Sequence, residues 1–142
     1  MSGTSDLFQA TATRVGVRVS AEFEQLTMLR ALTETALLMA EMPLDEVTDI
    51  QVAVDEIATA VIDSAVLGSE LKCEFGFHVG WVSVFITAVA GTRYPIDEQG
   101  LGWHVVRTIT DSLSADVGSF DAVAGGYPVT VEFDRTGGYL GL

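Results

Sequence analysis

The chain has 142 residues, a length typical of one compact domain rather than of a multidomain protein. Hydrophobic residues make up 49% and charged residues 19%, which excludes an intrinsically disordered chain. The formal net charge is -13, and such a field repels nucleic acid and anionic lipid surfaces while it attracts a basic partner.

The single cysteine and the lack of a long apolar run bear on where the protein works. Cys73 has no second cysteine for an intramolecular disulfide, which is typical of a reducing compartment. The sequence contains no apolar stretch of the ~20 residues that cross a bilayer, and its start lacks the order of a signal peptide. His78 and His104 have no further ligand at metal spacing. We therefore expect a cytoplasmic protein with no metal site and with neither nucleic acid nor a membrane as its partner.

The first half of the chain predicts one strand followed by two helices. Residues 1–10 are small, polar and aperiodic, so we expect a flexible N-terminus. Residues 13–19 alternate apolar with polar or small residues, which is the period of a half-buried strand. Apolar residues at three- and four-residue steps then predict a helix from an N-cap at Ser20 to about residue 42, and a second helix over residues 43–68.

The second half predicts an antiparallel pair of strands, a long loop, a third helix and two closing strands. In chain order these elements span residues 71–78, 81–86, 91–100, 101–113, 114–120 and 128–133. The order β-α-α-β-β-α-β-β indicates the α+β class, as a two-layer α/β sandwich with a mixed, mostly antiparallel sheet and helices on one face. The folded domain is expected to cover residues 11–135, followed by a flexible tail over residues 136–142.

Two features of the sequence suit chemistry or ligand binding. Glu56 lies beside the apolar stripe of the second predicted helix, where a half-buried carboxylate reaches the surface, pairs with a base such as Arg30 or Arg107, or serves as a general base. Gly100-Leu101-Gly102 opens the third predicted helix, where glycines let backbone N–H groups approach a phosphate. The same glycine pattern also occurs at ordinary loop-to-helix junctions, so both interpretations stay open.

Three stretches in this order resemble motifs of the Bergerat-type, histidine-kinase-like (GHKL) ATPase fold that sensor histidine kinases, gyrase and anti-sigma kinases share. Residues 50–60 are similar to the second-helix motif of that family, residues 100–107 to its second glycine box, and residues 127–133 to its closing strand. The resemblance extends over residues 15–133. The short single-domain length fits the branch of the RsbW-like anti-sigma factors better than it fits a histidine kinase.

The resemblance implies a nucleotide site that this chain retains in part. Glu56 stands where the family has the carboxylate that activates a nucleophile, but Ala60 stands where the family has the asparagine that holds magnesium. A methyl group coordinates no metal. The first glycine box falls on residues 86–91, which keep Gly91 and lack the adenine-binding aspartate, leaving the Thr87 hydroxyl as the adenine contact.

We therefore expect weakened ATP or ADP binding and lost magnesium binding, with Glu56 as the candidate general base. The nucleotide positions that the resemblance implies are Glu56, Ala60, Thr87, Gly91, Gly100, Leu101 and Gly102.

By the same resemblance, the chain is expected to be an anti-sigma factor that sequesters a stress- or sporulation-type sigma factor. The family forms homodimers and releases the sigma factor when a STAS-domain anti-anti-sigma factor competes for it. Arg30 on the first predicted helix is the tentative partner contact, with a solvated helix charge as its alternative. Two other functions stay open, namely an active serine/threonine kinase that phosphorylates the anti-anti-sigma factor and a nucleotide-sensing module without a sigma partner.

The net charge has two interpretations that depend on where the acidic residues lie. Sigma factors carry basic faces that bind DNA and polymerase, so a concentrated acidic surface would attract such a face. Acidic residues spread evenly over the surface would instead indicate a device for solubility.

Overall fold

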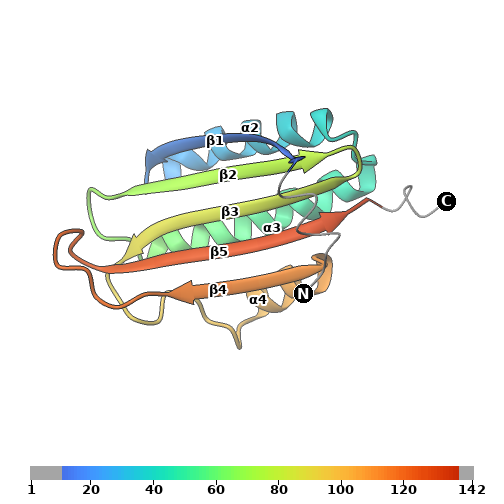
Figure 1. The fold of residues 1–142 in the computed structure, drawn as a ribbon. Coiled ribbons are helices and arrows are strands. Elements are labelled where there is room, and N and C mark those ends of the chain that lie inside the picture. The colour runs from blue at the N-terminus through green and yellow to red at the C-terminus, as the bar shows by residue number, and fades with distance from the viewer. Residues whose placement is uncertain (1–10, 138–142) are drawn as a thin grey trace.

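The computed structural model describes residues 11–137 and has helices and strands in the predicted order (Figure 1). The predicted flexible N-terminus, and the predicted tail beyond residue 137, lie outside the described residues. The elements are β1 (Thr13–Ser20), the short 3-10 helix η1 (Phe23–Gln25), α2 (Leu26–Met39), α3 (Leu44–Asp63), β2 (Glu70–His78), β3 (Trp81–Ala90), α4 (Leu101–Ile109), β4 (Ser112–Val117) and β5 (Tyr127–Thr136).

The strands form one sheet in the order β1-β2-β3-β5-β4, with the helices on one face (Figure 1). The predicted α+β sandwich is thus confirmed. Every pairing between the strands that the structure describes is antiparallel, whereas a mixed sheet was expected. Along the chain, α4 and β4 come between β3 and β5. In the sheet, β5 lies between β3 and β4 and runs antiparallel to both, so that β3 and β4 are not neighbours.

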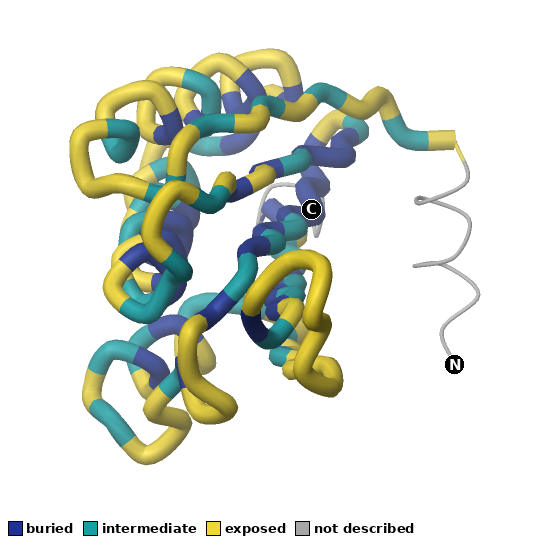
Figure 2. Tube along the Cα trace, turned by 90° about the vertical axis from the view of Figure 1, so that its left-hand side faces the viewer, coloured by how far each residue is buried: buried dark blue, intermediate teal, exposed yellow. Residues whose placement is uncertain are grey.

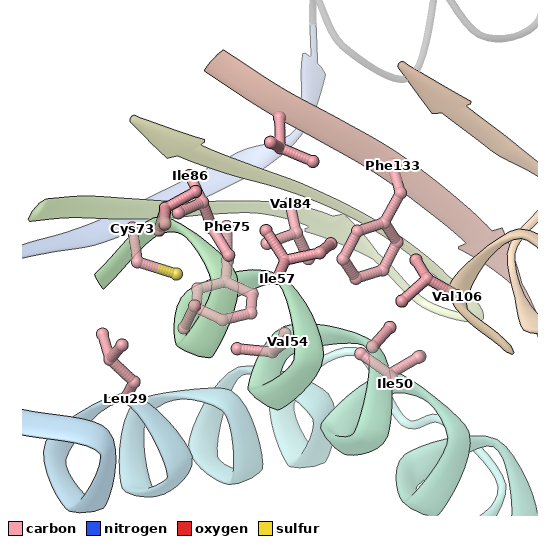
Figure 3. Close-up of a cluster of buried hydrophobic side chains, with 14 of the residues drawn as sticks. Leu29, Ile50, Val54, Ile57, Cys73, Phe75, Val84, Ile86, Val106 and Phe133 are labelled. Carbon is pink, nitrogen blue, oxygen red and sulfur yellow. The ribbon is translucent and has the colours of Figure 1, made fainter. Parts of the chain in front are cut away.

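The core lies between the helices and the sheet, where dark blue segments gather in Figure 2. Successive side chains of β3 point to opposite faces of the sheet, so that Val82, Val84 and Ile86 all face the core and are buried. From the other side, α3 contributes residues spaced three and four apart along one stripe. Figure 3 shows Leu29 of α2 and the α3 residues Ile50, Val54 and Ile57 facing Cys73, Phe75, Val84, Ile86 and Phe133 of the sheet, with Val106 of α4 beside them.

The first predicted helix is wrong at both ends. Ser20 is the last residue of β1 rather than a helix cap, because it pairs with Glu70 of β2, and the helical segment begins at η1. The helix ends at Met39 because Glu41 adopts a left-handed backbone conformation with φ 53. The Glu41 and Met42 N–H groups then donate to carbonyl oxygens of the last turn and close the helix.

The other two helices are shorter than predicted because the residues that follow them pair with neighbouring strands. α3 ends at Asp63 and not near residue 68, since Ala65 forms a bridge with Ala90 of β3. α4 ends at Ile109, since residues 112 and 113 join β4 and pair with β5. The buried face of α4 carries Trp103 and Val106, whereas Leu101 at its start is 79% exposed.

Candidate functional site

A pocket of about 270 Å³ lies between α3 and α4, and the loop that precedes α4 forms its third wall. Its volume is just below the ~300–1,000 Å³ typical of small-molecule sites. α3 lines it with Glu56, Ile57 and Ala60, the loop with Ile96, Asp97 and Gly100, and α4 with Leu101, Gly102, Trp103 and Val106. The structure therefore brings together the predicted positions of the second-helix motif and of the second glycine box.

Glu56 is exposed at the edge of this pocket, not half-buried beside the core as predicted. Its neighbour Ile57 takes the core-facing position, and one residue step of about 100° along the helix turns Glu56 toward α4. Of the alternatives for this carboxylate, the structure agrees with a side chain that reaches the surface, and Arg30 pairs with the neighbouring Asp55 instead. Arg30 Nε donates to both carboxylate oxygens of Asp55, each at 3.1 Å.

The two glycines at the start of α4 lie directly beneath carboxylates of the chain. A Cβ added at Gly102 would collide with Oε2 of Glu56, and a Cβ added at Gly100 would lie 2.8 Å from Oδ2 of Asp97. Asp97 is held by its own loop, because its Oδ1 accepts a hydrogen bond from the Gln99 N–H at 3.1 Å and its carbonyl accepts one from the Gly100 N–H at 3.0 Å. Both glycines therefore leave room for the close approach of an acidic side chain, which would have to move aside for a larger residue.

The groups that line the pocket do not fit a magnesium nucleotide. Ala60 presents a methyl group where magnesium would need an oxygen. The charged residues among the described lining residues are Glu56 and Asp97, both acidic, with no lysine or arginine to meet phosphate charge. Within residues 11–137, no group of three or more His, Cys, Asp or Glu side chains is arranged to hold a metal ion.

The two remaining predicted nucleotide positions lie outside the lining of this pocket. Thr87 is on the sheet face opposite the helices, because Ile86 and Ala88 on either side of it face the core. It lines an open groove on that outer face together with Arg18 and Lys72. The predicted adenine contact from Thr87 into the α3–α4 pocket is therefore not compatible with the strand register.

Gly91 lies at the end of β3, where its N–H donates to the Ser64 carbonyl oxygen at 2.7 Å. Its place is thus structural, since it ties the end of β3 to the end of α3.

Sequence reasoning missed five residues that line the pocket: Ile57, Ile96, Asp97, Trp103 and Val106. The long loop before α4 indicated that a residue such as Asp97 could take part in a site. The close approach of Asp97 to Gly100 was not predictable from the sequence. Trp103 belongs to the core and is 7% exposed, so one side chain contributes both to the core and to the pocket wall.

The negative charge is concentrated on the helical layer. Ten of the twenty acidic residues fall within residues 22–63, which form η1, α2 and α3, and Arg30 is the one basic residue of that stretch. The outer face of the sheet is less negative, because its five acidic residues, Glu70, Glu74, Asp116, Glu132 and Asp134, are offset in part by three of the seven basic residues, Arg14, Arg18 and Lys72. The two faces of the sandwich therefore differ in charge.

The outer surface of α2 also carries apolar side chains. Met28, Leu38 and Met39 are more than half exposed, whereas Met42, beyond the helix end, is buried. None of the helices within residues 11–137 is long and apolar enough to cross a membrane.

Comparison with known proteins gave sequence relatives. No family model matches the chain. The anti-sigma-F factors RsbW of Mycobacterium tuberculosis strains CDC 1551 / Oshkosh and ATCC 25618 / H37Rv are each 28% identical to this chain over 99 residues, which is 70% of this chain. The match spans 59% of the length of each relative. This similarity agrees with the resemblance to the RsbW-like anti-sigma factors.

Proposed function

We propose that this chain is an anti-sigma factor that sequesters a stress- or sporulation-type sigma factor by stoichiometric binding. The observation that carries this proposal is the acidic helical layer, with ten acidic residues and one basic residue within residues 22–63. Such a surface attracts the basic faces that sigma factors present to DNA and polymerase. The similarity to RsbW supports the same role in partner switching.

The helical layer combines the two features that a binding surface needs. The carboxylates steer the partner during approach, and the exposed apolar side chains of Met28, Leu38 and Met39 on α2 supply area that is buried on contact. We place the sigma-binding surface on α2 and the adjoining β1 edge. The chain acts in the cytoplasm as a homodimer, and a STAS-domain anti-anti-sigma factor releases the sigma factor by competition.

A paired set of charge variants tests this surface. Glu24→Gln with Glu34→Gln removes two exposed charges from the helical layer, and Glu98→Gln with Asp116→Asn removes two exposed charges elsewhere. We expect the first pair to slow association with the sigma factor about tenfold at low salt and to flatten its salt dependence. The control pair should leave the rate nearly unchanged. Equal effects of both pairs would show that the charge serves solubility.

Arg30 is the proposed polar contact within this surface. Its guanidinium is 54% exposed and already bound to Asp55, so an acidic group of the partner would replace or share that carboxylate. Arg30→Glu is expected to weaken sigma binding. Asp55→Asn is the matched control, because it removes the internal pair and leaves Arg30 available. An unchanged affinity in Arg30→Glu refutes the contact.

The nucleotide site is proposed to be degenerate, so that sequestration proceeds without catalysis. Phosphoryl transfer relies on a metal that neutralises phosphate charge, and Ala60 supplies no ligand for one. Incubation with radiolabelled ATP, magnesium and a STAS-domain protein tests this point. We expect no labelled STAS protein, and magnesium-dependent labelling would identify the chain as a working serine/threonine kinase instead.

A further inference from the structure

The start of α4 has the geometry of an anion site, but the chain fills it with its own carboxylates. Backbone N–H groups of the first helical turn are not bonded within the helix, and the helix dipole makes this end positive. Gly100 and Gly102 remove the side chains that would shield this end. Oε2 of Glu56 and Oδ2 of Asp97 occupy the space that those side chains would take.

The two carboxylates come from different elements and are positioned independently. Glu56 extends from α3, which packs along α4, whereas Asp97 belongs to the loop that leads into α4. The Gln99 N–H holds the Asp97 carboxylate, so this side chain does not need a ligand to be ordered. A phosphate at this helix end would meet two negative charges at close range, with no lysine or arginine among the described lining residues to offset them.

We propose that Glu56 and Asp97 serve as internal anions at the N-terminus of α4 and exclude nucleotide phosphates from the α3–α4 pocket. Gly102 then leaves room for the Glu56 side chain and not for a phosphate. This inference goes beyond loss of the magnesium ligand at Ala60, because it accounts for exclusion of the nucleotide even without metal. It also gives Glu56 the role of excluding phosphate in place of that of a general base.

Binding of pyrophosphate and of ADP in magnesium-free buffer, measured by isothermal titration calorimetry, tests the exclusion. We expect no binding by the unmodified chain at millimolar ligand. Glu56→Gln with Asp97→Asn removes both charges but keeps the side-chain shapes, and Glu56→Ala with Asp97→Asn also empties the space above Gly102. Pyrophosphate is expected to bind detectably at millimolar concentration once the charges are removed, and more tightly to the alanine variant.

Glu98→Gln is the matched control, because Glu98 is an exposed acid of the same loop that does not line this pocket. The same gain in Glu98→Gln would show a general effect of net charge and overturn the proposal. ADP binding by the unmodified chain that weakens in Glu56→Gln would make Glu56 a ligand. Failure of both double variants to gain affinity would also overturn it. No sigma factor enters this experiment, so its outcome is separate from that of the sequestration test.

A stability cycle tests the contact between Glu56 and Gly102 directly. Alanine normally stabilises a helix relative to glycine, so Gly102→Ala should raise the thermal unfolding midpoint unless its Cβ meets an obstacle. We expect Gly102→Ala to raise the midpoint less in the unmodified chain than in the Glu56→Ala background, because the exposed Glu56 side chain has to move aside for the added Cβ. Gly91→Ala, where the added Cβ meets the Ser64 carbonyl oxygen at an ordinary 3.7 Å, should respond equally in both backgrounds. An equal change of the midpoint for Gly102→Ala in both backgrounds would contradict the contact.

Discussion

Arg135 of β5 joins the two helices that form the pocket, and its replacement by methionine tests how that pocket is held. The guanidinium contacts Glu46 and lies 3.3 Å from Oδ2 of Asp49, both in the first part of α3. It also donates a hydrogen bond to the carbonyl oxygen of Ile109, the last residue of α4. One side chain therefore fixes the start of α3 and the end of α4 to the sheet.

The cost of Arg135→Met follows from the burial of its partners. The Arg135 and Glu46 side chains are only 17% and 15% exposed, whereas Asp49 is 42% exposed and stays solvated without its partner. Removal of one member of a fully buried ion pair costs about 3–5 kcal/mol. Because water still reaches part of Glu46, we expect a loss of about 2–3 kcal/mol in the free energy of unfolding, or about 5–10 °C in the melting temperature.

Urea unfolding followed by tryptophan fluorescence measures this loss. The double variant Arg135→Met with Glu46→Met removes the stranded carboxylate, so we expect it to recover all but about 1 kcal/mol, which remains because Ile109 loses its donor. Arg18→Met is the control, because Arg18 and Glu70 are more than half exposed and 4.0 Å apart, and such pairs contribute little. The reasoning is refuted if Arg135→Met is as mild as Arg18→Met, or if the double variant is no more stable than the single one.

Three further predictions concern the core and the outer sheet face. Phe133→Ala, at a fully buried position, should lower the free energy of unfolding by about 3–5 kcal/mol in urea, and a loss below about 1 kcal/mol would contradict the core assignment. Burial raises the pKa of the Cys73 thiol to about 12, so the native protein should resist a thiol reagent at pH 8 and react fully once unfolded; rapid native labelling would show that Cys73 is accessible. Burial, and secondly the charge of Asp134, raise the pKa of Glu132 above its usual 4.5. The folded state thus disfavours the ionised form, and stability falls as pH rises through this range. Glu132→Gln should therefore stabilise the protein at pH 7 and have little effect at pH 3, as urea midpoints at the two pH values will show; an equal effect at both would refute the titration.

The order and type of the elements were predictable because they depend on local periodicity. Alternation along β1 and the three- and four-residue steps along α3 reflect which side chains face the core, and this information is present in the sequence. The ends of the helices were not predictable in the same way. α4 stops at Ile109 because β5 offers pairing partners to the following residues, and those partners lie about twenty positions further along the chain.

In the candidate site, too, the residues were predictable from the local sequence, whereas the contacts between distant residues were not. Glycines before a helix and a carboxylate on the preceding helix were visible in the sequence, and the register of β3 already excludes Thr87 from the helical face once the strand is recognised. The sequence did not show that Arg30 binds Asp55 while Glu56 lies against Gly102. Adjacent acidic residues on one helix differ only in the direction in which their side chains leave the helix axis.

The sequence alone was enough to predict the class of fold, the resemblance to anti-sigma factors, the alanine at the position where that resemblance implies a magnesium ligand, and the amount of negative charge. Only the tertiary structure decided where that charge acts. Packing of α3 beside α4 brings Glu56 onto a glycine 46 positions away, and packing of α2 and α3 on one sheet face gathers half of the acidic residues into one layer. Both outcomes depend on contacts between distant segments, which periodicity and composition do not encode.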